Sequence, residues 1–523
     1  MLKALNGHYA ILLVHEASGS FWAVSDRRAQ QPLFLYRAGR CVYISTKASD
    51  FCRLSRPPAF NPRWLYEMIY FNHPVLETSF LEGVSRVPPA TILGWQPGDE
   101  SFSCKLWASP FSRAEKLVSG EDAARLELAT FDAIAKDYFD DDSRTAVSLT
   151  AGFDSRSVLA SAPRRSNLLT YTYGRPDCID LKDAAAIAGA LGVRHLGIEL
   201  TDRFLQSLPE LMVATVRDSD GLERVLRAEL LAAYPLLASM DRNISIGGVS
   251  GDHIFRDHLN GFGNVPHIIS PEMMGYIHGR GDGLENYRLA ALFAESFDDF
   301  RDHIDACLKC LSERHGDIRR PEGYQRYLVY ESAPKHFGGE AALASNFVVF
   351  RSFFWDPRMV ELSFTTNRAT LGLSERFPRK NYFAESAAQA GVIAAGKHYG
   401  GGRIHGVSAS TWARNSRTAY IVERLVARGT RFISNGFQRP KHANFLNWPG
   451  WLAGTANPLC KELLGPNARL REYVDGRFLD SFEPASELPL ASRLLTAELV
   501  IRLLQEQWPS KFQVNGAYYR ADS

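Results

Sequence analysis

Short runs of alternating apolar and polar residues dominate roughly the first hundred positions of the chain. The clearest are HYAILLVH at 8–15, SFWAVSD at 20–26, PLFLYR at 32–37, CVYIST at 41–46 and ATILGW at 90–95, with turn residues between them. Alternation over this length is typical of strands that bury one face. The pattern therefore predicts a mostly antiparallel β layer over residues 1 to about 107.

After this layer the apolar spacing becomes helical, and strands and helices then alternate. The stretch EDAARLELATFDAIAKDYF at 121–139 has the periodicity of a helix with one buried face. Strands are predicted at 145–149, 168–174 and 244–248, with helices after the first two, the second of them over 180–192. Such alternation predicts an α/β fold with a doubly wound parallel sheet whose ligand lies at the carboxyl ends of the strands. From about residue 284 helices are expected to dominate.

Small and polar residues crowd the junction between the first predicted parallel strand and its helix, in the stretch VSLTAGFDSRSVLA at 147–160. A junction of this composition presents backbone N–H groups and the positive end of a helix to an anion such as a phosphate. The alternative is an ordinary strand-to-helix turn in which an Asp or Ser caps the helix. The candidate phosphate-binding residues are Thr150, Ala151, Gly152, Asp154 and Ser155.

The predicted strand at 244–248 ends in a similar turn, GGVSGDHIF at 247–255, which carries Asp252. Either Asp154 or Asp252 alone is more often a helix cap or a solvated turn residue. Together, at corresponding positions after two neighbouring parallel strands, they would hold one Mg²⁺ through carboxylate oxygens while the turns supply N–H donors. The pair therefore predicts a site for a metal-bound polyphosphate.

Composition and charge narrow the class of protein. A chain of 523 residues suggests two or three domains. Its 60 Lys and Arg residues against 58 Asp and Glu residues provide no basic excess for nucleic acid or an anionic membrane. Seven unevenly spaced cysteines indicate reduced thiols rather than a disulfide framework, and no apolar run reaches the length of a membrane span. We therefore expect a cytoplasmic protein that binds neither nucleic acid nor membrane.

The two turns and three further segments resemble the asparagine synthetases, a family of ATP-pyrophosphatase amide ligases. LTAGFDS resembles the Ser-Gly-Gly-x-Asp-Ser pyrophosphatase loop, with Thr150 and Ala151 for the first Ser and Gly, and GGVSGDHIF resembles the Ser-Gly-Glu-Gly-x-Asp-Glu-Leu-Phe segment. YTYGRPDCIDLKDAA resembles the family's second strand with its Asp-Leu-Lys helix start, and FRSFFWDPRMVEL resembles its Arg-x-Pro-Phe-Leu-Asp-x-x-Leu-Val-Glu segment. LNGHYAILLVHEASGSFWAVSDRRAQQPLFLY resembles the later part of the N-terminal glutaminase layer. In family order, these matches span about residues 5 to 410.

The resemblance implies amide-bond formation that uses ATP and Mg²⁺. ATP is cleaved between its α- and β-phosphates, a carboxylate becomes an acyl-adenylate, and an amine attacks it. Family position implies that Lys397 neutralises charge on the reacting phosphorus. It also implies that four residues flank the nucleotide, namely Leu149, Tyr173, Gly247 and Gly248. The implied partners are small-molecule or peptide carboxylates and amines, with a homodimer or a peptide-processing protein as further possibilities.

The same resemblance divides the chain into three parts. Residues 1–107 would form a partial glutaminase-like β domain that lacks the nucleophile. Residues 115–420 would form the ATP-pyrophosphatase and amide ligase domain, and residues 421–523 a helical C-terminal extension.

Two departures from the family pattern bear on the substrate. The family's glutaminase uses an N-terminal Cys, whereas the first cysteine here is Cys41, which we expect to be a buried thiol inside a strand. Val249 stands where the family has a Glu that assists deprotonation of the amine. Lasso-peptide macrolactam synthetases share the ATP half, lack glutaminase activity and vary at that Glu, so attack by a peptide α-amine is favoured. Asparagine synthesis from ammonia or glutamine and an inactive scaffold are the alternatives.

Three other motifs suggest a P-loop kinase, a zinc site or a serine hydrolase, but each departs from the pattern that its chemistry needs. GVIAAGK at 391–397 has the spacing of a Walker A loop, but His398 replaces the Mg²⁺-binding Ser or Thr and a helix, not a strand, is predicted before it. CLKC at 307–310 has no second pair at zinc spacing, and Cys307 lies on an apolar helical stripe, so packing in the core is expected. The GVSGD turn has Asp252 where a serine nucleophile elbow needs Gly.

Overall fold

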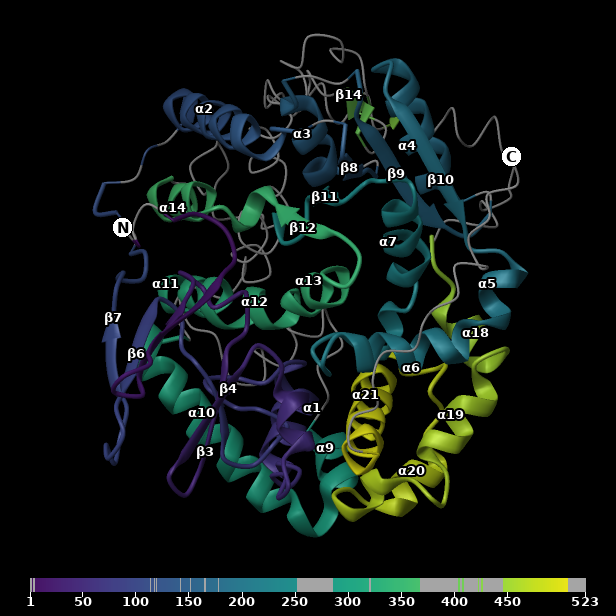
Figure 1. Cartoon of the computed structure of the whole chain (residues 1–523). Coiled ribbons are helices and arrows are strands. Elements are labelled where there is room, and N and C mark those ends of the chain that lie inside the picture. The colour runs from purple at the N-terminus through teal and green to yellow at the C-terminus, as the bar shows by residue number, and fades with distance from the viewer. Residues whose placement is uncertain are drawn as a thin grey trace.

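The computed structural model describes residues 5–251, 286–366 and 445–506, apart from positions 113, 117, 119, 142, 151, 164–165, 177 and 319–320. It also describes residue 2 and the short pieces 403–404, 407–408, 422 and 425–426. In Figure 1 the purple and blue N-terminal strands lie at the lower left and the strands of the central sheet lie in the upper half. The yellow-green C-terminal helices lie at the lower right.

Two antiparallel sheets form the N-terminal part of the fold, as the alternating pattern predicts. Their strands are β1 (Ala10–His15), β2 (Ser20–Ser25), β3 (Phe34–Ala38), β4 (Cys41–Ser45), β5 (Val84–Arg86), β6 (Thr91–Trp95) and β7 (Ser103–Leu106). One sheet has the order β1-β2-β6-β7 and the other the order β4-β3-β5. Ala23 and Leu93 of the first sheet share a core with Leu35 of the second. Each of the five predicted runs therefore contains a strand.

A helix that the pattern did not predict, α1 (Pro62–Phe71), lies within this β-rich part. The Asn61 side chain caps it by accepting a hydrogen bond from the N–H of Arg63, and Pro62 occupies the first turn. Asn72 ends it in the left-handed conformation, with φ 62°. The buried face of α1 joins the main hydrophobic core of the molecule.

Cys41 is exposed, which corrects the expectation of a buried thiol. It is the first residue of β4 and lies opposite Ala38 at the turn end of the β3–β4 hairpin. β4 is also an edge strand, and Gly39 turns the chain with φ 60°. A residue at the turn end of an edge hairpin has neighbours on few sides, so the strand pattern alone overestimated its burial.

Five parallel strands form the central sheet. They are β8 (Thr145–Ser148), β9 (Leu169–Gly174), β10 (Arg194–Glu199), β11 (Ile244–Gly247) and β12 (Val349–Ser352). The first, second and fourth of these were predicted within one residue at each end, whereas β10 and β12 were not. The spatial order is β10-β9-β8-β11-β12, and every neighbouring pair is parallel. Chain order therefore reverses between β8 and β11, where open parallel sheets bind ligands outside the carboxyl ends of the strands.

Helices cover both faces of this sheet. In this part of the chain they are α2 (Gly120–Tyr138), α3 (Phe153–Ser161), α4 (Ile179–Ala190), α5 (Asp202–Gln206), α6 (Leu208–Asp218) and α7 (Leu230–Ser239). Val147 packs in a core with residues of α2, α3 and α4, whereas Ala146, on the other face of β8, joins the core that contains α6 and α7. Burial on both faces is typical of a parallel sheet wound in both directions.

Helices make up most of the described chain after residue 285, as the apolar spacing predicts. They are α9 (Asn286–Phe293), α10 (Phe297–His315), α11 (Pro321–Tyr327), α12 (Ala333–His336), α13 (Gly338–Ala344), α14 (Pro357–Thr365), α18 (Trp448–Ala453), α19 (Asn457–Leu464), α20 (Gly476–Ser481) and α21 (Leu488–Gln505), and a small hairpin pairs β13 (Arg403–Ile404) with β14 (Val407–Ser408). Both α10 and α21 pack on α1. Phe300, Ile304, Cys307 and Leu311 are buried, which confirms the predicted apolar stripe of α10. None of the described helices is long and apolar enough to cross a lipid bilayer.

Candidate functional site

The turns that follow β8 and β11 lie directly against each other where the strand order reverses. A Cβ atom on Gly248 would lie 2.6 Å from Cβ of Asp154 and 2.8 Å from the backbone nitrogen of Ser155. A Cβ atom on Gly251 would overlap the Asp154 carboxylate. Two glycines therefore allow a backbone approach that any side chain would prevent.

This contact confirms that the two predicted turns converge. Asp154 lies in the first turn of α3, half-buried, with its carboxylate against Gly251, the residue that precedes Asp252. Asp252 itself lies outside the described residues, as do Ala151 and Lys397. Joint metal binding by Asp154 and Asp252, and the role of Lys397, stay predictions.

Hydroxyl groups hold the turn after β8 in shape. The backbone N–H of Thr150 donates to Oγ of Ser155 at 2.9 Å, and the N–H of Gly152 donates to Oγ1 of Thr150 at 3.2 Å. The Ser155 hydroxyl donates to the carbonyl of Thr150 at 3.2 Å. Since the N–H groups of Thr150 and Gly152 are engaged within the turn, an anion here would bind to the first turn of α3. First-turn N–H groups lack carbonyl partners within their own helix, so they suit a phosphate.

The turn after β11 is anchored by the segment that includes and follows β12. Ser250 has a left-handed backbone with φ 67°, and its hydroxyl accepts a hydrogen bond from the indole N–H of Trp355 at 3.0 Å. The hydroxyl of Ser352 donates to the carbonyl of Val249 at 2.7 Å. A serine in this conformation is costly, and it persists because both hydrogen bonds hold the turn. The FRSFFWDPRMVEL stretch therefore shapes the described part of the turn through the hydroxyl of Ser352 and the indole N–H of Trp355.

The remaining residues predicted to flank a nucleotide have different surroundings. The side chain of Leu149 is fully buried in the core between the sheet and α3, and its N–H donates to the carbonyl of Tyr171 at 2.9 Å. Gly247 is the buried last residue of β11. Tyr173, near the end of β9, is half-buried, with its ring centroid 6.4 Å from that of Phe445. Leu149 therefore packs behind its turn, while Tyr173 keeps part of its surface exposed.

A cluster of buried charges beside Tyr173 was not anticipated from the sequence. Glu340 accepts hydrogen bonds from the hydroxyl of Tyr234 at 2.6 Å and from the guanidinium of Arg227 at 2.8 Å. Arg227 also donates to Glu229 at 3.1 Å. Burial raises the pKa of Tyr173 well above its usual value, and it raises the pKa of Glu229 to about 7. The cluster therefore contains a carboxyl group that exchanges its proton near neutral pH.

No protein-family model matches this chain, and no curated protein matches it. The physical basis for a function is therefore the pair of turns at the strand reversal, together with the motif resemblance of their sequences.

Proposed function

We propose that the chain is an ATP- and Mg²⁺-dependent ligase of the asparagine synthetase type, which activates a carboxylate as an acyl-adenylate and joins it to an amine. The observation that carries the proposal is the contact between the turns after β8 and β11 at the reversal of strand order. These are the two turns whose sequences resemble pyrophosphatase motifs. Because one fold hosts many functions, the assignment rests on this site and not on the sheet.

The described residues fit a metal-bound polyphosphate. Gly248 and Gly251 leave no side chain where the turns meet, so the backbone of the second turn lies directly against Asp154 and Ser155 of the first. Asp154 contributes a carboxylate, the hard oxygen ligand that Mg²⁺ prefers, and the N-terminus of α3 favours an anion. Bound Mg²⁺ would neutralise charge on the leaving pyrophosphate. We assign Asp252 as the second carboxylate and Lys397 as the cation beside the reacting phosphorus.

For the amine, we favour a peptide α-amine that closes a macrolactam. The support is Val249, whose side chain cannot accept a proton at the position where the family has a Glu. The N-terminal sheets are, in this proposal, a glutaminase-like layer, whose first cysteine, Cys41, is exposed at the turn end of a hairpin. Aspartate with ammonia or glutamine is the competing substrate pair.

The test is exchange of labelled pyrophosphate into ATP by the full chain, in the presence of aspartate or of a peptide with a free α-amine and an acidic side chain. We expect Mg²⁺-dependent exchange, lowered about 100-fold or more in Asp154→Asn. Asp202→Asn is the matched control, because Asp202 also lies in the first turn of a helix that follows a strand of the same sheet, but after the edge strand β10. Asp202→Asn should exchange at the parent rate.

The outcomes separate the candidate functions. Exchange with the peptide supports the macrolactam assignment, and exchange with aspartate alone replaces it with asparagine synthesis. If neither the peptide nor aspartate supports exchange, the ligase proposal is overturned and the inactive scaffold is favoured. Equal loss in Asp154→Asn and Asp202→Asn would show that the site at the strand reversal is wrongly placed.

A further inference from the structure

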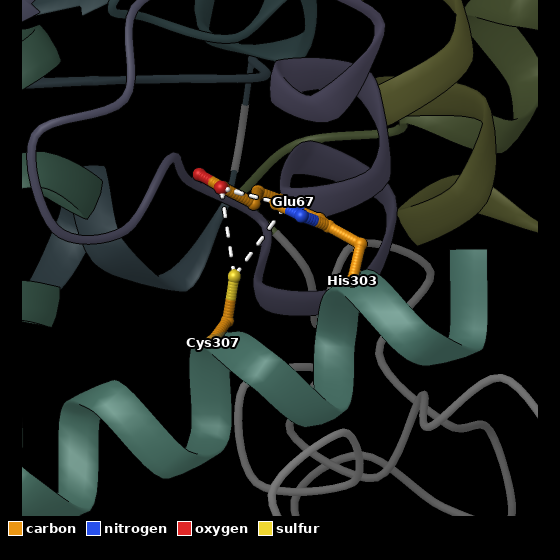
Figure 2. A group of neighbouring side chains, drawn as sticks. All are labelled: Glu67, His303 and Cys307. Atoms are coloured by element: carbon orange, nitrogen blue, oxygen red, sulfur yellow. Dashed lines mark hydrogen bonds and ion pairs between the residues drawn. The ribbon is translucent and has the colours of Figure 1, made fainter. Parts of the chain in front are cut away.

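Three side chains that bind metals in other proteins meet between α1 and α10, away from the turns of the central sheet (Figure 2). Glu67 comes from α1, and His303 and Cys307 come from α10. Because His303 and Cys307 are four residues apart, they lie one turn apart on the same face of the helix. All three ligand atoms lie within 4.8 Å of one another.

The spacing of these atoms matches one face of a tetrahedral metal site. Nε2 of His303 is 3.0 Å from Oε1 of Glu67 and 3.4 Å from Sγ of Cys307, and Sγ of Cys307 is 3.7 Å from Oε1 of Glu67. Usual Zn–N, Zn–O and Zn–S bond lengths in a tetrahedron place such ligand atoms about 3.3–3.6 Å apart. The three observed distances are therefore within about 0.4 Å of those needed, without any movement of the backbone.

A nucleophilic Cys–His–Glu relay does not fit the same geometry. Such a relay needs the two ring nitrogens of the histidine to face different partners. Here the same nitrogen, Nε2, faces both Glu67 and Cys307. The thiol is also buried, and burial together with the neighbouring Glu67 raises the pKa of Cys307 above its usual value, which disfavours a free thiolate nucleophile.

The carboxylate is held in place independently of α10. Oε2 of Glu67 accepts a hydrogen bond from the N–H of Val75 at 2.8 Å, and Oε1 accepts one from the hydroxyl of Thr78 at 2.9 Å. Outer hydrogen bonds of this kind orient the ligands in metal sites. The side chain of Glu67 is 1% exposed and that of His303 is 17% exposed, so the cluster is enclosed but reachable from solvent on the histidine side.

We propose that Glu67, His303 and Cys307 bind a divalent transition-metal ion, with Zn²⁺ as the best match, and that a water completes the coordination. One nitrogen, one oxygen and one sulfur ligand suit the borderline softness of Zn²⁺ better than that of Mg²⁺ or Ca²⁺. Binding would remove the proton of the Cys307 thiol, shift the proton of a neutral His303 to Nδ1, and leave the carboxylate and thiolate to balance the charge of the ion.

The ion would fasten α1 of the N-terminal layer to α10. Figure 1 shows these two helices in the lower half, whereas β8, β11 and α3 lie in the upper half. The site therefore lies apart from the turns of the central sheet, and the metal proposal does not depend on the proposed ligase activity. From the CLKC motif only packing of Cys307 in the core was expected. Cys307 is indeed buried, but its Sγ lies 3.7 Å from Oε1 of Glu67, a residue 240 positions away in the sequence, while Cys310 is exposed.

The probe is Co²⁺ added to the full chain after chelator treatment and dialysis. We expect a thiolate-to-Co²⁺ charge-transfer band and the intense ligand-field bands of four-coordinate Co²⁺, both displaced by Zn²⁺. Cys307→Ser should abolish the charge-transfer band and weaken Zn²⁺ binding roughly 100-fold or more, since loss of an outer hydrogen bond alone costs about 10–100-fold. Thr78→Val should weaken binding within that smaller range. Cys310→Ser, on the exposed side of the same helix, is the matched control and should keep the band.

A structural readout accompanies the spectrum. Zn²⁺ should raise the midpoint of thermal unfolding of the parent chain and of Cys310→Ser, but not that of Cys307→Ser. If Cys307→Ser does not fold, His303→Ala, which removes the more exposed ligand, provides the test of metal binding. The proposal is overturned if the parent chain shows no charge-transfer band, if the band survives in Cys307→Ser, or if His303→Ala binds Zn²⁺ as tightly as the parent.

Discussion

Replacing Gly248 with alanine tests the contact on which the proposed site depends. The added Cβ would lie 2.6 Å from Cβ of Asp154 and 2.8 Å from two backbone atoms, the carbonyl carbon of Asp154 and the nitrogen of Ser155. Ordinary contact begins near 3.4 Å, so one turn must move by about 0.8 Å. Backbone atoms cannot rotate away as a side-chain tip can. Overpacking of this kind destabilises a fold by about 1–3 kcal/mol.

The matched control is Gly247→Ala, one residue earlier, at the last position of β11. Its Cβ would lie 3.6 Å from the ring of Phe350, which is ordinary van der Waals contact. Both substitutions reduce the entropy of the unfolded chain equally, by an amount that stabilises by about 0.4–1 kcal/mol when the native backbone tolerates alanine. The difference between the two variants therefore isolates the clash of Gly248→Ala with the first turn of α3.

The measurement is the free energy of unfolding by urea for both variants, together with pyrophosphate exchange. We expect Gly248→Ala to be less stable than Gly247→Ala by about 1–3 kcal/mol. Displacement of Asp154 by close to 1 Å should also lower exchange by about 100-fold, because catalytic groups tolerate little misplacement. Unfolding free energies that agree within about 0.5 kcal/mol would refute the direct contact between the turns after β8 and β11.

Three further predictions address charged groups. Asp154→Asn and Asp252→Asn should each abolish Mg²⁺-dependent AMP and pyrophosphate release, and the double variant should be little less active than either single variant. Mild losses that add in the double variant would instead identify both residues as helix caps. Lys397→Ala should lower kcat by about 10²–10³ and leave the KM for ATP nearly unchanged, and a kcat within a few-fold of the parent would remove Lys397 from the reaction. In the folded chain the pKa of Glu229 is about 7, above its ordinary value of 4.5. The contribution of this carboxyl to the free energy of unfolding is therefore fully present below about pH 4.5 and is lost as the pH rises through 7. Urea titrations at pH 5 and pH 8 should show the parent chain losing about 3 kcal/mol more than Glu229→Gln, and equal losses would contradict the raised pKa.

Local sequence patterns predicted much of the fold. Alternation identified five of the seven strands of the N-terminal sheets, all except β5 and β7. The small-residue turns after β8 and β11 were found together with their aspartates. These features depend on residues close in sequence, because small and polar residues that end an apolar run favour a turn at that point of the chain. The apolar stripe of α10 was also predicted, since helical periodicity is a property of one segment.

Other features were not predicted because they depend on the position of an element among its neighbours. β12 has one strand partner, β11, and the sequence of four residues, VFRS, does not show that it will join a parallel sheet. Cys41 has the sequence surroundings of a strand interior, yet the edge position of its hairpin exposes it. Burial is set by what packs on a strand, not by the strand's own pattern.

The sequence by itself determined the α/β class, the N-terminal antiparallel layer, and the identity of the turns that carry Asp154 and Asp252. The structure confirmed the expectation that β8 and β11 are neighbouring parallel strands. Only the tertiary structure decided that this pair lies at the reversal of strand order, and that the backbone of Gly251 lies against the Asp154 carboxylate. It also decided that Glu67 of α1 meets His303 and Cys307 of α10. The physical reason is the difference in sequence separation. Turn chemistry and periodicity depend on residues a few positions apart, whereas a site is formed by atoms that folding brings within 3–4 Å of one another from positions up to 240 residues apart.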